Sequence, residues 1–231
     1  MSELYLIRHG QASFGTKNYD QLSEPGYEQS RLLGLYFRER NISFDHAIVG
    51  SMQRHHQTLD GINQGLAMEK PQSHRAHPGF NEYDFPALIK SFSRRYPDDD
   101  LVRLIAANPQ DKKNYYRLLR RVLTAWAGDI LADVPETWAA FQQRVAEARS
   151  MLHELAVKGN RVLVVSSGGA ISQFIGSVLN LSAEKVFELN LQIHNTGICH
   201  FYFNAHTIRL AGFNGLPHLD RPECAGLVTY A

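Results

Sequence analysis

Short apolar segments that read as β-strands alternate along this chain with segments of helical periodicity. Strand-like segments occupy residues 4–7, 46–49, 161–165, 198–203 and 208–213, and the clearest helical segments occupy residues 24–38, 136–157 and 170–179. Such alternation is typical of a sheet with largely parallel strands, because each helix returns the chain to the same end of the sheet. We therefore predict an α/β fold, a three-layer sandwich with a mostly parallel central sheet flanked by helices.

Residues 86–134 have a different pattern. Charged residues, aromatic residues and leucines are mixed there at helical spacing, and no strand is evident. We expect a helical cap inserted into a single domain that spans residues 1–231. From Lys90 to Arg121 this segment has nine basic and four acidic residues, whereas the whole chain has a net charge of +1. A local basic excess attracts anionic ligands, although a solvated helix face is the simpler interpretation.

Composition argues against several classes of protein. A net charge of +1 gives no general affinity for nucleic acid, and no apolar run approaches the roughly 20 residues that span a bilayer. The first residues lack the basic and apolar regions of a signal peptide. The two cysteines, Cys199 and Cys224, form neither a disulfide framework nor a metal-binding spacing. We therefore expect a cytoplasmic protein without a metal ion or cofactor, and its oligomeric state stays open.

Three polar motifs each follow a strand-like segment. Arg8-His9-Gly10 follows the first, Arg54 lies on the helix after the second, and Ser166-Ser167-Gly168-Gly169 follows the third. Ligands of open α/β sheets bind beyond the carboxyl ends of the strands. The three motifs can therefore meet at one edge of the sheet, although they lie far apart in the sequence.

These residue types suit phosphoryl transfer. Arginine pairs with phosphate through two parallel hydrogen bonds, and a neutral histidine can attack phosphorus as a nucleophile. Gly10 allows close backbone approach, helix N-termini offer N–H groups to an anion, and Glu82 is a candidate proton donor. Each motif alone also has a purely structural explanation, such as a tight turn or a surface arginine. Their combination in this order is what favours phosphoryl transfer.

The chain also resembles the phosphatase branch of the histidine phosphatase superfamily, which has a phosphoglycerate-mutase-like fold, over nearly its whole length. The matching segments are Leu6–Gln11, Leu22–Gln29, Arg54 with Gln57-Thr58, Phe80–Glu82, Glu136–Trp138 with Phe141 and Arg144, and Val164–Gly169. The resemblance implies that His9 is the nucleophile and Glu82 the proton donor. It implies phosphate binding by Arg8, Arg54, Gly10, Ser167 and Gly168.

One departure from the family pattern concerns Ser167. The family places a second histidine directly before Gly168-Gly169, and losing one such donor costs about 3 kcal/mol of transition-state stabilisation. Gly50 also stands where the family often has serine. We hypothesise that His55 or His194 supplies part of the missing positive charge. Further candidates for substrate binding are Gln11, Arg94 and Arg95.

The preferred function is therefore a phosphomonoester hydrolase that acts through a phosphohistidine, without a metal ion, on an anionic phosphorylated substrate. The substrate would be a small phosphorylated molecule or a phosphopeptide. The alternative is a catalytically weak phospho-ligand-binding or regulatory protein, which the serine at position 167 motivates. A phosphoglycerate-type mutase is the least favoured of the three, because Phe80–Asp84 looks more like the phosphatase branch.

Overall fold

The computed structural model describes residues 1–13, 20–68, 73–108, 111–157 and 159–230. Its centre is a six-stranded sheet in the order β3-β2-β4-β1-β5-β6. The pairs β1–β4, β2–β4 and β2–β3 are parallel, and the pairs β1–β5 and β5–β6 are antiparallel. The strands are β1 (Ser2–Arg8), β2 (His46–Val49), β3 (His74–Ala76), β4 (Arg161–Ser166), β5 (Ile198–Phe203) and β6 (Ile208–Gly215).

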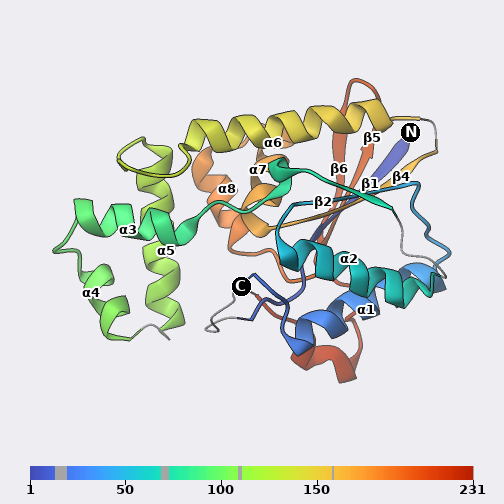
Figure 1. Ribbon diagram of the computed structural model, residues 1–231, viewed down its shortest axis with the longest axis horizontal. Helices are drawn as coiled ribbons and strands as arrows, with labels where there is room; N and C mark the ends of the chain where they lie inside the picture. The colour runs from blue at the N-terminus through green and yellow to red at the C-terminus, as the bar shows by residue number, and fades with distance from the viewer. Residues whose placement is uncertain (14–19, 69–72, 109–110, 158, 231) are drawn as a thin grey trace.

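Helices cover both faces of this sheet, which confirms the predicted α/β class (Figure 1). On one face lie α1 (Glu24–Glu39) and α2 (Gln53–Leu66), and on the other lie α6 (Trp138–Leu152) and α7 (Gly168–Leu179). A separate apolar cluster fills each interface: Leu33 and Ile62 belong to one, Phe141 and Ile171 to the other. Alternate residues of the strands enter opposite clusters, as the two-residue period of a strand requires.

Local sequence signals set where the helices begin. The Ser23 hydroxyl accepts a hydrogen bond from the backbone N–H of Gly26 over 3.2 Å, and Pro25 occupies the first turn of α1. Asp84 caps the helix that begins at Phe85 in the same way: its side chain accepts a hydrogen bond from the backbone N–H of Ala87. Both match the preference for a short polar residue before a helix and proline just inside it.

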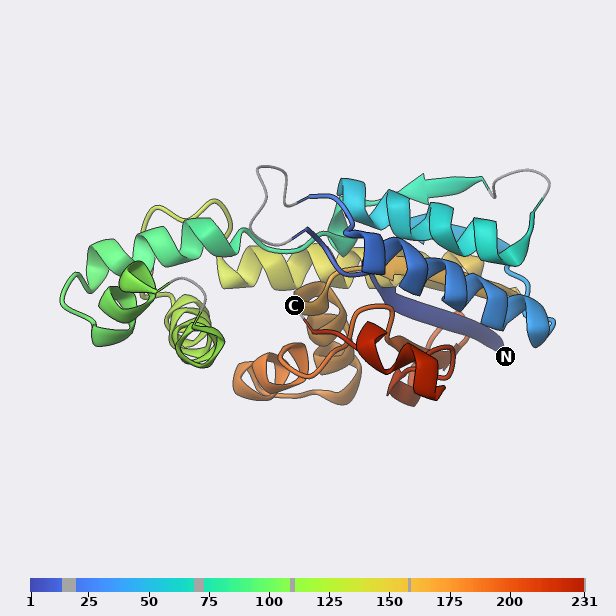
Figure 2. The same ribbon diagram turned by 90° about the horizontal axis from the view of Figure 1, so that it is seen from below.

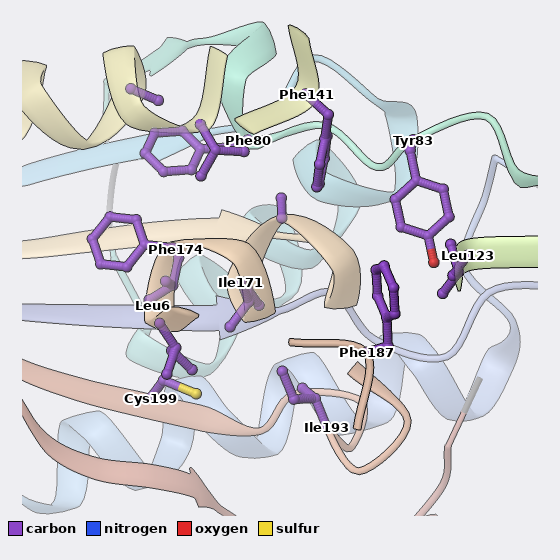
Figure 3. Packing of buried hydrophobic residues seen from close by; sticks show 14 of the residues in the cluster. Leu6, Phe80, Tyr83, Leu123, Phe141, Ile171, Phe174, Phe187, Ile193 and Cys199 are labelled. Carbon is purple, nitrogen blue, oxygen red and sulfur yellow. The ribbon is translucent and has the colours of Figure 1, made fainter. Parts of the chain in front are cut away.

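The helical insertion consists of α3 (Phe85–Arg95), α4 (Asp100–Ala107) and α5 (Lys112–Ala127). Figure 2 shows these three helices extending beyond one end of the sheet. The apolar cluster beneath α6 and α7 continues into them: Tyr83, Phe187 and Leu123 lie next to the residues that cover the sheet (Figure 3). This continuity supports one domain with an insertion at about residues 86–134, which stays a prediction.

Two elements were not predicted from the sequence. Strand β3 has three exposed residues without an apolar pattern, and α8 (Ala183–Asn190) follows α7 after a short turn. The helix predicted for residues 136–157 is shorter than expected, because α6 ends at Leu152 and a 3-10 turn follows. Within the described ranges, none of the helices has the length and apolar character needed to cross a membrane.

Candidate active site

The registers of the central strands bring the three sequence motifs to one edge of the sheet. Arg8 at the end of β1 pairs with Ser166 at the end of β4, and Val49 at the end of β2 pairs with Val165. The antiparallel β5 begins at this same edge, where Ile198 pairs with Ile7. The residues that follow β1, β2 and β4, and those that precede β5, are therefore neighbours.

His9 has a defined ring orientation. Its side chain is buried, its Nδ1 lies 2.7 Å from the Gly10 carbonyl oxygen, and its Nε2 accepts a hydrogen bond from Nε of Arg54 over 3.2 Å. A guanidinium group only donates and a carbonyl only accepts. The proton therefore sits on Nδ1, and Nε2 carries the lone pair that a nucleophile needs.

The surroundings of His9 also keep its ring neutral. Burial, and then the positive charges of Arg54 and Arg8, hold the pKa of the His9 imidazole well below its ordinary value of 6.5. Burial and like charge both disfavour the protonated form. The lone pair on Nε2 is therefore available at neutral pH and well into the acidic range.

Arg54 connects three groups at this edge. Besides its contact with His9, its Nη1 lies 2.9 Å from Oδ1 of Asp20, and its Nη2 lies 3.4 Å from Oγ of Ser167. Asp20 also accepts the backbone N–H of Gln53 at the start of α2. Asp20 thus fixes both the helix start and the guanidinium. Sequence reasoning missed it, because a lone aspartate before a helix carries no signal about a partner more than 30 residues away.

The side chain of Arg8, the first residue of the motif, contacts the turn before β5 and the start of α7. Its Nη1 donates to the carbonyl oxygen of Ile193, in the turn that precedes β5. A Cβ atom added to Gly168 would lie 3.6 Å from Cζ of Arg8 and 2.5 Å from Oδ1 of Asn190. The guanidinium therefore lies against the first turn of α7, and a side chain at position 168 would have to displace the Asn190 amide.

The loop after His9 is packed against α1 and α2. A Cβ atom on Gly10 would lie 2.4 Å from the carbonyl oxygen of Gly26, and the Gly10 N–H donates to Oγ1 of Thr58 over 3.0 Å. Gln11, a candidate for substrate binding, accepts a hydrogen bond on its side-chain oxygen from Ser23. The glycine therefore lets this loop pack closely against α1, and its part in phosphate binding stays a prediction.

The carboxylate of Glu82 lies at the N-terminus of α7. Its Oε2 accepts the backbone N–H of Gly169 over 3.1 Å, and its Oε1 accepts the N–H of Tyr83. Arg144 on α6 holds this segment: its guanidinium donates to the Asn81 carbonyl over 2.9 Å and pairs with Glu136. The segment carrying Glu82 is thus attached both to α6 and to the start of α7.

Ser167 and His55 form a buried pair beside His9. Nε2 of His55 lies 2.7 Å from Oγ of Ser167, and the ring centroids of His9 and His55 are 5.7 Å apart. Both side chains have no exposed surface. The structure therefore brings His55 to the side chain that stands before Gly168-Gly169. Burial and the charge of Arg54 hold the pKa of the His55 imidazole well below 6.5, so the ring is neutral and does not supply the positive charge expected from the sequence.

The remaining candidates are not brought to His9 in the same way. The ring of His194 stacks against Tyr230 with centroids 4.2 Å apart, and its Nδ1 contacts Asn214. Arg94 and Arg95 are exposed in the last turn of α3, which ends at the outer tip of the insertion (Figure 1). Two nearby cations of the insertion, Arg103 and Arg121, pair with aspartates.

Sequence reasoning also missed Asn195. Its Nδ2 donates to the carbonyl oxygen of His9 over 3.1 Å, and its Oδ1 accepts from Oγ1 of Thr229. Gln29 of α1 donates to Thr229 and accepts the N–H of Gln11. A chain of hydrogen bonds therefore links the loop after β1 to the end of the protein. A single asparagine in a turn gives no sequence signal for this role.

Comparison with known proteins agrees with this geometry. The histidine phosphatase superfamily (branch 1) matches residues 4–127 and 106–215 in two overlapping stretches. The 2,3-bisphosphoglycerate-dependent phosphoglycerate mutase of Lactobacillus acidophilus is 21% identical over 83% of this chain and 90% of its own.

Two solved structures share the fold over nearly the whole chain. A mutant phosphoserine phosphatase from Entamoeba histolytica, in complex with phosphoserine, superposes with a TM-score of 0.64 at 16% identity, and covers 95% of this chain and 100% of its own. An alpha-ribazole phosphatase from Shigella flexneri gives a TM-score of 0.62 at 20% identity, with 93% and 96% covered. The family match spans the strands, the insertion and all three motifs, and the chain belongs to the histidine phosphatase superfamily, branch 1.

Proposed function

We propose that this protein is a phosphomonoester hydrolase that acts through a phosphohistidine on His9. The observation that carries the proposal is the hydrogen bond from Arg54 to Nε2 of His9, together with the one from Nδ1 to Gly10. These two contacts leave the lone pair on the nitrogen that faces a phosphate-binding cation. Arg8 and Arg54 would bind the phosphoryl oxygens, with Gly10, Ser167 and Gly168 at the adjoining backbone.

The first step transfers the phosphoryl group to the protein. Nε2 of His9 forms a bond to phosphorus while the bond from phosphorus to the ester oxygen breaks. Protonated Glu82 gives its proton to that leaving oxygen, so that an alcohol departs. The two arginines offset the charge that the equatorial oxygens carry in the transition state.

The second step returns the protein to its starting state. Glu82, now a carboxylate, takes a proton from a water molecule, and the water oxygen attacks the phosphorus of phosphohistidine. The N–P bond breaks, inorganic phosphate leaves, and both His9 and Glu82 regain their initial protonation. The sequence of steps uses no group beyond those of the chain and water, and independence from metal ions is part of the proposal.

The proposed substrate class is inferred from proteins that this chain resembles. One structural neighbour was solved with phosphoserine, another is an alpha-ribazole phosphatase, and a relative in sequence is a phosphoglycerate mutase. We propose a small phosphorylated molecule or a phosphopeptide as substrate. We also propose that the protein acts in the cytoplasm and not on nucleic acids or membranes.

A second candidate is a protein that binds a phosphorylated ligand and turns it over slowly. Serine at position 167 favours this alternative, because a hydroxyl offers one neutral donor where a histidine could offer a charged one. The two functions predict the same ligand and differ in the rate of turnover.

The experiment that separates them is hydrolysis of an aryl phosphate in the presence of a chelator, by the wild-type protein and by His9→Ala. Activity that persists with chelator and disappears in His9→Ala supports the hydrolase. Trapping of the radiolabelled phosphoryl group of a substrate on wild-type protein quenched in alkali, in which phosphohistidine is stable, and its absence in His9→Ala, would identify the intermediate. Tight binding of inorganic phosphate without turnover would favour the binding protein.

A further inference from the structure

The buried pair of His55 and Ser167 has an arrangement that packing alone does not explain. Ser167 is the residue before the first turn of α7, a position where serine usually accepts a backbone N–H of the helix. Its side chain makes no such capping bond. Its Oγ instead lies 2.7 Å from Nε2 of His55 and 3.4 Å from Nη2 of Arg54. The hydroxyl is therefore turned from its own helix toward the arginine that contacts His9.

The His55 ring occupies the space beside Gly50, where a side chain would otherwise lie. A Cβ atom on Gly50 would lie 2.1 Å from Nδ1 and 2.6 Å from Cε1 of His55. Any side chain at position 50 would therefore overlap the ring in its present position. Glycine after β2 and histidine in the first turn of α2 fit each other, and the pair places the imidazole against Ser167.

The donors around Ser167 determine what its hydroxyl group can bind. A phosphoryl group only accepts hydrogen bonds, so Ser167 can bind it only by donating its single hydroxyl proton. The Ser167 oxygen must then accept from its other neighbours. Arg54 always donates, and His55 donates when the proton of its ring lies on Nε2.

We propose that His55 is a positioning residue for phosphoryl transfer: it donates from Nε2 to Oγ of Ser167 and thereby directs the Ser167 hydroxyl proton to a phosphoryl oxygen. This inference rests on the proposed function and assigns a role to a histidine outside the arginine-histidine-glycine motif. The imidazole comes from α2, and the donor proposed to touch phosphate comes from the residue directly before α7. Together the two side chains supply one oriented donor.

The adjacent histidine on α2 offers a matched control. His56 is only half-buried, and its Nδ1 lies 3.1 Å from Nε2 of His74, on the exposed strand β3. His55 and His56 thus differ in burial and partner while sharing residue type and helix. Replacement of His56 by alanine is expected to leave hydrolysis and phosphate binding unchanged.

The test is a double-mutant cycle on aryl phosphate hydrolysis with His55→Ala, Ser167→Ala and the double variant. We expect Ser167→Ala to lower kcat by about 10²-fold, as for one lost donor to a transition state. We expect His55→Ala to lower kcat by about tenfold to a hundredfold with less change in KM, as for loss of a supporting partner. The double variant should be no slower than Ser167→Ala, since His55 acts only through that hydroxyl.

Two further variants separate positioning from packing. His55→Gln keeps a donor near the place of Nε2 and should recover most of the lost kcat, whereas His55→Leu should not. Thermal unfolding of each variant shows whether the fold is kept. If His55→Ala has wild-type kcat, or if it slows the Ser167→Ala protein as much as it slows the wild type, the proposal is wrong.

Vanadate binding keeps this test independent of turnover. Vanadate adopts the five-coordinate geometry of the transferring phosphoryl group, so its affinity should fall at least tenfold in His55→Ala and remain unchanged in His56→Ala. If the wild-type protein binds vanadate but hydrolyses nothing, the proposed hydrolase fails while the role of His55 stands on the affinity loss. If His55→Ala binds vanadate as tightly as the wild type, the role of His55 fails. If the wild type neither hydrolyses aryl phosphates nor binds vanadate, both proposals fail.

Discussion

Nε of Arg54 donates a hydrogen bond to Nε2 of His9 over 3.2 Å, so the unprotonated nitrogen of the ring faces a cation. A bound phosphoryl group would take the place of that contact, since the same guanidinium then pairs with phosphoryl oxygens. Arg54 therefore holds His9, the proposed nucleophile, in the tautomer with its proton on Nδ1. Its other two contacts, to Asp20 and Ser167, fix the plane of the group.

Substitution of Arg54 by lysine should lower kcat/KM by about 10²- to 10³-fold. Lysine keeps the charge but presents a single ammonium, which cannot reach His9, Asp20 and Ser167 together as the planar fork does. Steady-state kinetics with an aryl phosphate would measure the loss. Arg161→Lys, which alters a half-exposed ion pair with Glu3, is a suitable control and should be near wild type. A fully active Arg54→Lys protein would contradict the role of the fork.

The pH dependence of kcat/KM should have its acid limb below pH 6.5. Burial and the charges of Arg54 and Arg8 hold the pKa of His9 well below 6.5, so the imidazole stays neutral and nucleophilic as the pH falls through that value. Removing one cation with Arg54→Gln favours the protonated ring and should move the acid limb to higher pH.

In the proposed first step Glu82 gives a proton to the leaving oxygen. Glu82→Gln has no such proton to give and should therefore lower kcat for substrates with poor leaving groups more than for activated aryl esters. Profiles of wild type, Arg54→Gln and Glu82→Gln would be measured at saturating and limiting substrate. A wild-type acid limb near or above pH 6.5 would contradict the neutral His9 described here.

Substitution of Gly50 by alanine should destabilise the fold by about 1–3 kcal/mol, because the added methyl group overlaps the His55 ring. Combining it with His55→Ala should restore part of the loss, since the smaller side chain makes room. Equilibrium unfolding in urea would measure both effects. Gly226→Ala is the matched control, because a Cβ atom there meets nothing within 4 Å. Equal destabilisation with and without the His55 ring would contradict the overlap.

Stability should fall with pH below 6.5, in part because of His218. Burial lowers the pKa of this histidine to about 3, and its Nε2 lies 2.8 Å from Oγ1 of Thr196. The unfolded chain takes up a proton at His218 below pH 6.5, whereas the folded chain does not until far lower. The free energy of unfolding contributed by this site should thus drop by about 2 kcal/mol between pH 6.5 and 5.

His218→Gln keeps a donor for Thr196 and removes the titration, so its stability should depend less on pH. Replacing the exposed His206 by glutamine serves as the control. Urea unfolding at several pH values would compare the slopes. If the His218→Gln protein lost as much stability as the wild type over this range, the buried neutral imidazole would not be the cause.

Charge reversal at Arg94 and Arg95 should leave kcat/KM within about twofold of wild type. Both side chains are exposed in the last turn of α3, and Arg95 lies over the ring of Tyr96. Surface charges this far from a site act only through the screened solvent. Kinetics at two salt concentrations would test this. A strong loss with multiply charged phosphates would instead indicate that the substrate reaches the tip of the insertion.

Several features could be read from the sequence because they depend on local patterns. Ser23 with Pro25 marks the start of α1, and the β-branched segment after Asn160 is β4. The edge strand β3 could not be predicted, because its pairing comes from β2 and not from an apolar pattern of its own. Helix α8 did carry a signal, in the Ser182 cap and the buried Val186 and Phe187, that was not used.

The residues of the candidate site likewise fall into those that could be predicted from the sequence and those that could not. His9, Arg54 and Glu82 could be proposed from their motifs, because residue type and position after a strand carry the information. Asp20 and Asn195 could not, since each acts through one hydrogen bond to a residue distant in sequence. The sequence did not distinguish His55 from His194; the structure does, because His55 contacts Ser167 and lies beside His9, whereas His194 contacts Asn214 and Tyr230.

The strand that presents His9 pairs only with strands made much later: β1 lies between β4 and β5. As the chain leaves the ribosome, residues 2–8 have no sheet partner until residue 161 and beyond have been synthesised. At about 5–20 residues per second, that interval is on the order of ten seconds or more. During this time the apolar residues of β1 lack their native sheet partners and are open to non-native contacts. The hydrogen bonds around Asn195, which contacts the carbonyl oxygen of His9, likewise form only after Thr229 has been synthesised.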